Sequence, residues 1–381
     1  MGRRQRKQLL VGINAHLLSG EAGYRRAGIH QYIAQVLQHL PPSFAYQFYT
    51  RQAIEQANGS FISSRLPTER RVVRIVWEQL VWPWIAWRQQ LDLLHGMAFV
   101  TPFITPCPTI VTIFDLSFMH YPERYPRLQQ RYLATQAARS CRQARRIITI
   151  AESGRQDVHR FFKIPLSQID VVYPGVDAVY RPLPEQEVAA FRQREQLPEQ
   201  FILHVGTLQP RKNILVLLEA LAVMGEAALP LILVGGKGWM FDEIFARVEA
   251  LGLQDKVRFT GYVPDDDLLL WYNAATLLAF PSVYEGFGLP IVEAMACGTA
   301  VIAANASSMP EAAGDAGVLF DPHSPAELAE RMVNVLADPA RLATMREQGL
   351  AQAQKFSWER AGRETAVVYE KALVGNVQGT R

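Results

Sequence analysis

Short apolar runs recur along the chain and alternate with longer segments in which apolar residues return every three or four positions. Runs of four to six mostly apolar residues are typical of strands buried on both faces of a parallel sheet. The clearest runs span residues 9–13, 109–114, 147–150, 201–205, 231–234 and 300–303. The longer segments, such as 29–40, show the spacing of an amphipathic helix. This alternation predicts an α/β protein.

The alternation is interrupted at residues 178–199, which are rich in proline and charged side chains and predict a linker. A length of 381 residues favours two domains of ordinary size over one. We therefore expect one domain over residues 1–177 and a second over 200–357, followed by a last helix over 358–374. Strand, loop and helix open each half, so both domains are predicted to be Rossmann-like. Neither opening loop carries GxGxxG, which disfavours a nicotinamide-dependent oxidoreductase.

The formal net charge of +3 conceals an asymmetry between the two halves. Residues 1–175 contain 22 Lys and Arg against 10 Asp and Glu, a net charge of +12, whereas residues 176–381 contain 17 against 26, a net charge of −9. A basic half suggests an anionic partner, such as a membrane surface, a lipid-linked phosphate or a nucleic acid. The alternative is that the arginines only coat solvated helix faces.

The three cysteines, Cys107, Cys141 and Cys297, have no paired spacing, which argues against a disulfide framework or a zinc site and favours a reducing compartment. The basic and then apolar start of the chain is broken by Asn14 and His16 and fits a first strand better than a signal peptide. No run is long and apolar enough to span a bilayer. The expected location is the cytoplasm, and association with the inner face of the cytoplasmic membrane is the alternative.

A strand, a glycine turn and a helix follow one another between residues 277 and 298. The strand ends at Phe280, and Gly286 and Gly288 then flank Phe287 before an apolar helix that starts near Leu289. Backbone N–H groups at the start of a helix have no partner within it, and they form a ready site for a phosphate or a sugar hydroxyl.

Two carboxylates bracket this turn. Glu285 precedes the helix, and Glu293 is expected in its first turn. A glutamate can accept hydrogen bonds from both vicinal hydroxyls of a ribose. The alternative is that Glu293 only offsets the helix dipole and that Glu285 is a solvated loop residue.

A second glycine loop opens the second half. The strand at 201–205 is followed by Gly206 and Thr207, and then by Arg211 and Lys212 before the next helix. Adjacent cations at the start of a helix are unfavourable against its dipole. Their presence therefore predicts an anionic ligand, and the pattern suits a diphosphate.

These segments resemble the family 4 glycosyltransferases, which are retaining, nucleotide-sugar-dependent enzymes of the GT-B fold. Glu285 and Glu293 are separated by seven residues within EGFGLPIVEAMACGTAVIA, which is similar to the EX7E signature of that family. GTLQPRKN, which begins at Gly206, and YPGVD, which begins at Tyr173, resemble two further family segments. The resemblance covers most of the chain. It implies two Rossmann-like domains facing a cleft, of which the first binds the acceptor and the second binds the nucleotide sugar. The last helix would cross back to the first domain.

The resemblance also implies a donor site. The glycine of the first loop, most simply Gly28, would lie beside the donor diphosphate, and backbone groups of Tyr262 and Val263 would contact the nucleotide base. The predicted donor-binding residues are Gly28, Gly206, Thr207, Arg211, Lys212, Tyr262, Val263, Glu285, Gly286, Phe287, Gly288, Leu289 and Glu293.

The loop after the strand at 109–114 supplies candidates from the first half. The family has His-Asp-Leu-Ser there, with the histidine near the donor sugar, but this chain has Phe114 in its place. Asp115 is kept, and His120 or His95 could occupy the space of the missing histidine. The predicted catalytic residues are Glu285, Arg211, Lys212, Asp115 and His120.

Four of the seven tryptophans, Trp77, Trp82, Trp84 and Trp87, cluster in one stretch that also contains arginines. Such a stretch can dock on a membrane or can be ordinary core. We favour core, because Pro83 should interrupt a long amphipathic face.

The run Asp265-Asp266-Asp267 invites a divalent-metal interpretation. The run precedes a helical segment, however, and acidic residues are favoured at a helix start. We therefore expect no metal and no cofactor besides the donor substrate.

The sequence thus predicts a retaining glycosyltransferase that moves a sugar, with GDP-mannose the favoured donor, to a glycan or lipid-linked acceptor in polysaccharide or lipopolysaccharide assembly. The expected partners are the nucleoside diphosphate sugar, the acceptor and an anionic membrane, and not a nucleic acid. The alternatives are a UDP-sugar-dependent transferase, a sugar-nucleotide epimerase of the same fold, and a non-catalytic nucleotide-binding scaffold, which Phe114 would suit.

Overall fold

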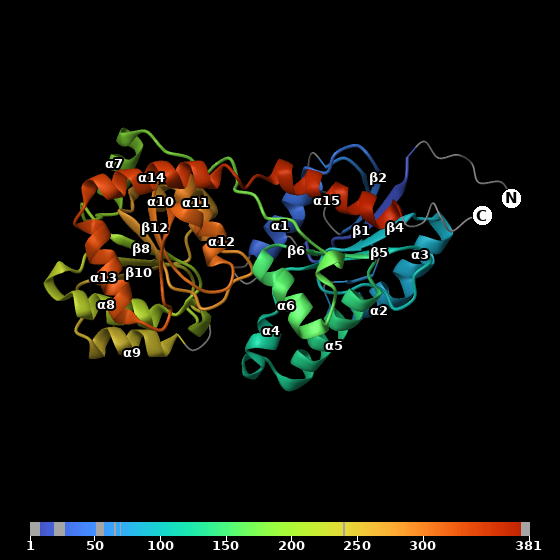
Figure 1. The fold of residues 1–381 in the computed structure, drawn as a ribbon, viewed down its shortest axis with the longest axis horizontal. Coiled ribbons are helices and arrows are strands. Elements are labelled where there is room, and N and C mark those ends of the chain that lie inside the picture. The colour runs from blue at the N-terminus through green and yellow to red at the C-terminus, as the bar shows by residue number, and fades with distance from the viewer. Residues whose placement is uncertain are drawn as a thin grey trace. The chain divides into compact units, whose positions relative to one another are not determined.

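The computed structural model describes residues 8–18, 27–50, 57–64, 66–68, 70–238 and 241–374. The chain divides into two compact units, each built on its own sheet (Figure 1). Unit 1 comprises Met1–Gly175 together with Trp358–Arg381, and unit 2 comprises Val176–Ser357.

Unit 1 contains a seven-stranded parallel sheet in the order β3-β2-β1-β4-β5-β6-β7. Its strands are β1 Leu10–Asn14, β2 Ala45–Tyr49, β3 Ser60–Ile62, β4 Leu93–Gly96, β5 Thr109–Ile113, β6 Arg146–Thr149 and β7 Ile169–Val171. Its helices are α1 Ala27–Gln38, α2 Arg71–Val76, α3 Trp82–Gln89, α4 Ser117–His120, α5 Arg127–Gln143, α6 Glu152–Phe162 and α15 Trp358–Leu373. Strands β4 and β5 are buried at every position, which explains their continuous apolar runs.

Unit 2 contains a six-stranded parallel sheet in the order β10-β9-β8-β11-β12-β13. Its strands are β8 Ile202–Val205, β9 Leu231–Val234, β10 Val257–Gly261, β11 Leu277–Phe280, β12 Ala300–Ala304 and β13 Val318–Phe320. Its helices are α7 Glu185–Arg194, α8 Ile214–Met224, α9 Asp242–Ala250, α10 Asp265–Ala274, α11 Leu289–Ala296, α12 Met309–Ala313, α13 Pro325–Leu336 and α14 Pro339–Ala353.

Both sheets reverse their strand order once. The reversal lies between β1 and β4 in unit 1 and between β8 and β11 in unit 2. In open α/β sheets, ligands bind beyond the carboxyl ends of the strands at this switch point, because the loops on its two sides diverge to opposite faces. Each unit therefore offers one position where a ligand site is expected.

The predicted linker at 178–199 is part of unit 2 and contains a packed helix, which corrects the sequence interpretation. Helix α7 occupies its middle, and Phe191 packs edge-on against Trp271 of α10 with ring centroids 5.1 Å apart. The guanidinium of Arg192 donates to the carbonyl of Ala274. Phe191 is the one buried residue of α7. The rest of the helix is polar and charged, which is why its sequence resembles a linker.

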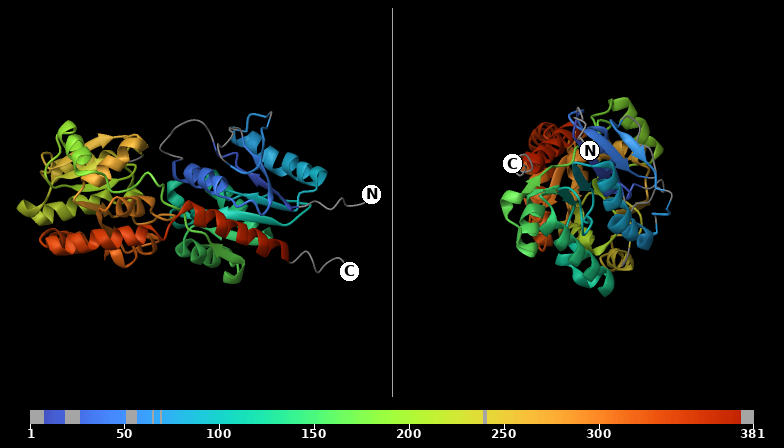
Figure 2. Two further views of the ribbon diagram at one scale, coloured as in Figure 1. Left: turned by 90° about the horizontal axis from the view of Figure 1, so that it is seen from above. Right: turned by 90° about the vertical axis from the view of Figure 1, so that its right-hand side faces the viewer.

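Helix α15 is part of unit 1, and Figures 1 and 2 show it in red beside α1. Trp358 meets Tyr32 of α1 edge-on at 5.8 Å, and the Tyr369 hydroxyl lies 2.8 Å from Nδ1 of His95 on β4. Gly362 provides the closest approach, because a Cβ atom at this position would lie 2.1 Å from the His39 carbonyl oxygen.

The tryptophan-rich stretch forms one continuous helical segment, in which a π-helical turn, Trp77–Val81, joins α2 to α3. Trp77 and Trp82 are buried and stack on each other, whereas Trp84 and Trp87 are exposed. The expectation that Pro83 interrupts the face was wrong, because proline is tolerated where a wide turn already leaves N–H groups unused. None of the helices in the described ranges is both long enough and apolar enough to cross a bilayer.

We expect Gly362→Ala to lower the free energy of unfolding of unit 1 by about 1–3 kcal/mol, because the new methyl group collides with the backbone carbonyl of His39, directly after α1. Gly154→Ala in α6 is the matched control, since its Cβ would meet no atom closer than 3.5 Å. Thermal and urea unfolding measure both variants, and equal stability of the two would contradict tight packing of α15 on α1.

Candidate active site

The carboxyl ends of β8 and β11, the two strands at the switch point of unit 2, bring together the charged residues predicted from the sequence. After β8 the chain passes through Gly206 and Thr207 to a short 3-10 helix, Pro210–Lys212, that leads into α8. After β11 it passes through Glu285 to the glycine turn before α11. The two loops are bound together by the N–H of Val283, which donates to the carbonyl of Arg211.

Glu285 sits between two cations. Its Oε2 lies 2.5 Å from a terminal nitrogen of Arg211, and its Oε1 lies 2.7 Å from Nζ of Lys212. The same Arg211 nitrogen donates to the carbonyl of Tyr284 at 2.6 Å. All three side chains are largely buried, so their charges interact through a medium of low polarity.

The charges of this cluster compensate one another. Burial alone would raise the pKa of Glu285, but Arg211 and Lys212 outweigh it and lower that pKa to about 2. Burial lowers the pKa of Lys212, and Glu285 opposes this shift. Nζ of Lys212 also lies 4.9 Å from the centroid of the Phe280 ring, a cation–π arrangement. Glu285 is therefore ionised at any physiological pH.

Two glycines allow the loops to approach each other. Gly206, with φ +154°, would place a Cβ 3.0 Å from Cε of Lys212, and Gly235, with φ +152°, would place one 2.1 Å from the Gly206 carbonyl oxygen. Only glycine adopts these angles without strain. The N–H of Leu208 then donates to the carbonyl of Gly236, which joins the loops after β8 and β9.

The glycine turn ends at Gly288, which has φ +102° and caps α11. Glu293 lies in the second turn of α11 and not in the first, which corrects the sequence interpretation. It is buried, and it accepts a hydrogen bond of 2.8 Å from the Tyr272 hydroxyl. Burial and then the charge of Glu293 raise the pKa of Tyr272 well above its usual range. An offset to the helix dipole does not explain a glutamate at this depth.

The residues predicted to contact the nucleotide base lie further along the sheet of unit 2. Tyr262 and Val263 follow β10, which is separated from β8 by β9. Tyr262 is 60% exposed, so its ring is available to a ligand.

The three aspartates lie at the start of α10, which begins at Asp265 after the N-cap Pro264. The carboxylate of Asp267 lies 3.7 Å from a nitrogen of Arg194, a surface pair. Among the residues that the structure describes, no group of three or more His, Cys, Asp or Glu side chains could hold a metal ion.

Comparison with known proteins identifies the family. Sequence models described as "Glycosyltransferase Family 4" and "Glycosyl transferases group 1" match residues 25–180 and 185–352. The O-antigen chain mannosyltransferase B of Escherichia coli is 36% identical over 282 residues, which cover 73% of this chain and 74% of that protein. The chain is a family 4 glycosyltransferase. It depends on a nucleotide sugar and has the α/β GT-B fold.

Further relatives match over smaller shares of their own length. The serotype-specific mannosyltransferase WbdA of Escherichia coli is 30% identical over 263 residues, which cover 66% of this glycosyltransferase but 32% of WbdA. A D-inositol 3-phosphate glycosyltransferase of Segniliparus rotundus is 38% identical over 226 residues, which cover 57% of this chain and 50% of that protein.

Solved structures show the fold. Sucrose-phosphate synthase from Thermosynechococcus elongatus aligns with a TM-score of 0.75 at 20% identity, covering 97% of this glycosyltransferase and 100% of that chain. Anabaena HepE in complex with UDP aligns with a TM-score of 0.73 at 20% identity, covering 95% and 99%.

In unit 1 of this glycosyltransferase, Asp115 and His120 have separate partners. The Asp115 carboxylate accepts the N–H of Ser117 at 2.8 Å, at the start of α4. Nε2 of His120 lies 2.7 Å from Asp157 of α6. The structure thus gives each of the two predicted residues a local structural partner.

The position of the missing family histidine is filled by packing. Phe114 is buried and meets Tyr32 and Phe99 edge-on at 5.1 and 6.1 Å. His95 does not replace the histidine either, because it is buried in β4 between Tyr369 and Thr112, and burial lowers its pKa to about 3.

Gly28, predicted to lie beside the donor diphosphate, is the second residue of α1. No atom lies within 4 Å of a Cβ added there.

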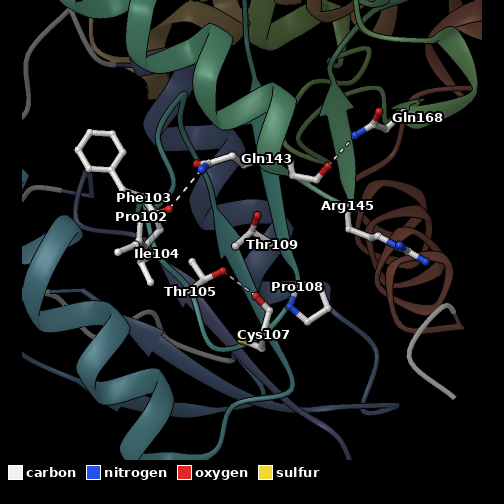
Figure 3. A pocket seen from close by; sticks show the side chains of 11 residues that line it. Pro102, Phe103, Ile104, Thr105, Cys107, Pro108, Thr109, Gln143, Arg145 and Gln168 are labelled. Atoms are coloured by element: carbon white, nitrogen blue, oxygen red, sulfur yellow. Dashed lines mark hydrogen bonds between the residues drawn. The ribbon is translucent and has the colours of Figure 1, made fainter. Parts of the chain in front are cut away.

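A cavity of about 790 Å³ lies elsewhere, at the amino-terminal ends of β5–β7 (Figure 3). Its polar groups mostly bond to one another: Gln143 donates to the Phe103 carbonyl, Thr105 to that of Cys107, and Gln168 to that of Ala144. A hollow whose polar groups mostly bond to one another, and which lies at the amino-terminal edge of its sheet, is not the donor site, because ligands of such sheets bind at the carboxyl ends of the strands.

Sequence reasoning missed the residues that hold Glu285 from behind. The hydroxyls of Ser307 and Ser308, in the loop after β12, both donate to the carbonyl of Glu285, at 2.7 and 3.0 Å. Ser307 has φ +50°, a strained value for serine that is typical of functional loops. The signal in the sequence was weak, because a serine pair in a loop is ordinary.

His204 was also missed, because it lies within an otherwise apolar strand. It is fully buried in β8, stacks on Phe280, and contacts the carbonyl of Ala279 through Nδ1 at 3.1 Å. Burial lowers its pKa to about 4, so a neutral ring lies beneath the charged cluster.

We expect Ser307→Ala to lower kcat at least about tenfold, because one of the two hydroxyls that fix the Glu285 backbone is lost while the strained φ remains. Ser307→Gly removes the same hydroxyl but relieves the strain, and should be as slow as Ser307→Ala yet more stable. Steady-state rates and thermal unfolding separate the two effects. Normal rates in both variants would show that the hydroxyl does not position Glu285.

Proposed function

We propose that this glycosyltransferase moves a sugar, with retention of configuration, from a nucleoside diphosphate sugar to a growing polysaccharide. GDP-mannose is the proposed donor, and a glycan or a lipid-linked glycan of O-antigen or lipopolysaccharide assembly is the proposed acceptor. The observation that supports this most is the cluster of Arg211, Lys212 and Glu285 at the switch point of unit 2. The sequence identity of 36% to an O-antigen mannosyltransferase supports the choice of mannose and of O-antigen assembly.

The cluster suits a leaving diphosphate. Arg211 and Lys212 are held in place before any ligand arrives, so they need no reorganisation to stabilise the charge that develops on the departing phosphate. Fixed cations can serve where other enzymes use a metal ion. The N–H groups of Gly286, Phe287, Gly288 and Leu289 border the same cluster and would bind the phosphate or sugar hydroxyls.

The two glutamates take different parts. Glu293, held by Tyr272, would accept the ribose hydroxyls. Glu285, held ionised by its two cations and oriented through its backbone, would position the donor sugar and offset positive charge on its anomeric carbon. Gly206 and Thr207 would line the diphosphate, and Tyr262 and Val263 would contact the base.

The decisive experiment is nucleotide release from GDP-, UDP- and ADP-sugars with EDTA present. We expect release from one donor, GDP-mannose, in the wild type and a loss of about a hundredfold to a thousandfold in kcat/KM for Arg211→Ala, because one fixed cation is removed from the leaving group. Glu285→Ala should be as impaired. Arg247→Ala is the control, since Arg247 pairs with Glu219 in a partly exposed ion pair of unit 2.

Other outcomes select the alternatives. Release from a UDP-sugar would change the donor, and nucleotide binding without release would favour a scaffold. Free nucleotide with an altered sugar and no acceptor would identify an epimerase. Loss of all release in EDTA would overturn the metal-independent mechanism. The anomeric configuration of the product, read by NMR, tests retention.

We further propose that unit 1 associates with an anionic membrane surface, at the cytoplasmic face. Five apolar residues on one face of the segment α2–α3 are exposed, at a helical spacing of three or four. They are Val72, Val76, Leu80, Trp84 and Trp87. The guanidinium of Arg88 lies 5.2 Å from the Trp84 ring. The boundary between lipid headgroups and acyl chains suits exposed tryptophan and aliphatic side chains with basic residues beside them.

Sedimentation with vesicles tests this surface. The wild type should be retained by vesicles containing anionic lipid at low salt, and released as salt screens its charges. Replacing Trp84 and Trp87 together by alanine should abolish retention, whereas Leu128→Ala, an exposed apolar residue of α5, should not. No retention of the wild type at low salt, or equal retention of both variants, would exclude this surface.

A further inference from the structure

The switch point of unit 1 holds a buried carboxylate that no part of the proposed donor chemistry uses. Glu78 lies on the π-helical turn between α2 and α3 and is 7% exposed. It reaches Asn14, the last residue of β1, whose Nδ2 donates to Oε1 of Glu78 at 3.1 Å. Asn14 pairs in register with Gly96 of β4, so Glu78 stands where the strand order of unit 1 reverses.

The π-helical turn is what directs Glu78 inward. Trp77 and Glu78 are consecutive and both buried, although neighbouring residues of a regular helix diverge by about 100° and rarely share one buried face. Trp77 packs against His16 at 4.1 Å and against Trp82. π-helical turns within α-helices are frequent at functional sites, because the extra residue re-aims one side chain.

The surroundings of Glu78 satisfy only part of its carboxylate. Oε1 of Glu78 accepts the hydrogen bond from Asn14 and lies 3.9 Å from Nε of Arg74. No described residue donates a hydrogen bond to Oε2. Asn14 is itself fixed, because its Oδ1 accepts the N–H of His16 at 3.2 Å. A buried carboxylate kept only for stability would be expected to have both oxygens bonded.

The charges around Glu78 select the kind of ligand. Arg74 disfavours a cation at Oε2, and the carboxylate disfavours an anion. A neutral group with a hydrogen to donate fits both conditions. Sugar hydroxyls are such groups, and the carboxylate is a strong acceptor for them.

We propose that Oε2 of Glu78 accepts a hydrogen bond from a hydroxyl of the glycosyl acceptor, and that Asn14 and Arg74 hold the carboxylate in position for it. This inference rests on the proposed transferase function and on the expectation that the first domain binds the acceptor. It adds the side chain of unit 1 that contacts the saccharide. Glu78 is a binding residue here, and no bond is made or broken at it.

Acceptor kinetics test the assignment. Glu78→Gln keeps the shape and an oxygen for Asn14 but replaces the charged acceptor. We expect the KM for a mannose-terminated disaccharide acceptor to rise about tenfold to a hundredfold, the range for a hydrogen bond to a charged group, while the KM for the donor stays within about twofold. Glu123→Gln, the same change at an exposed carboxylate of unit 1, should alter neither.

The pH profile separates binding from a structural role. Burial raises the pKa of Glu78 to about 7, against the lowering influence of Arg74 and of Asn14. The carboxylate is therefore ionised above this pH and protonated below it, so the wild-type acceptor KM should rise as the pH falls from 8 to 6. The groups that face Glu78 are Arg74, Asn14 and, beyond Asn14, His16. A profile that persists in Glu78→Gln would belong to another group and would overturn the proposal.

A direct binding measurement keeps the inference independent of turnover. Saturation-transfer NMR with methyl α-mannoside and the disaccharide should show binding to the wild type and its loss in Glu78→Gln. If that variant does not fold, Glu78→Asp replaces it: its shorter side chain should weaken binding but keep the pH dependence. If the wild type turns over and the acceptor KM of the variant is unchanged, the Glu78 site is refuted but the transferase function is not. Saccharide binding without any turnover refutes the transferase function and leaves the site supported.

Discussion

Two adjacent cations beneath a glycine loop are the constraint around which unit 2 is built. Arg211 and Lys212 are largely buried, and isolated buried charges are costly, so the fold must supply an opposite charge within contact distance. Glu285 is that charge. Its position depends on the serine pair after β12, and the approach of the cations depends on the absence of side chains at Gly206 and Gly235. A diphosphate entering this site would meet cations that are already in place.

The two switch points are alike in topology and opposite in electrostatics. In unit 2 a carboxylate is held ionised by two cations in contact with it, and its pKa falls to about 2. In unit 1 a carboxylate has one cation at 3.9 Å, and its pKa rises to about 7. The first arrangement suits a ligand with fixed negative charge, and the second suits a neutral ligand rich in hydroxyls. The same layout of strands thus presents two chemistries, set by a few side chains in the loops.

Much of this could be predicted from the sequence, because the strands are buried on both faces and the glycine loops carry charged residues at fixed places. The cluster of Arg211, Lys212 and Glu285 was found in this way. Glu78 could not be found, since a π-helical turn adds one residue to a helix and leaves no mark in the apolar spacing. The role of His95 was misjudged because a histidine near a strand end looks the same whether it faces a ligand or, as here, a tyrosine 274 residues later in the chain.

Helix α15 gives unit 1 an unusual order of assembly during synthesis. Unit 2 is a continuous segment and can complete its core as soon as its own residues have left the ribosome, whereas unit 1 lacks the helix that covers α1 and β4 until the residues from Trp358 onward are made. Domains generally fold as units, with the first-made domain folding first. Here the segment made first waits for the segment made last, so the side chains that α15 contacts, Tyr32 and His95 among them, stay open to chaperones, or to other nascent chains, for most of the translation time.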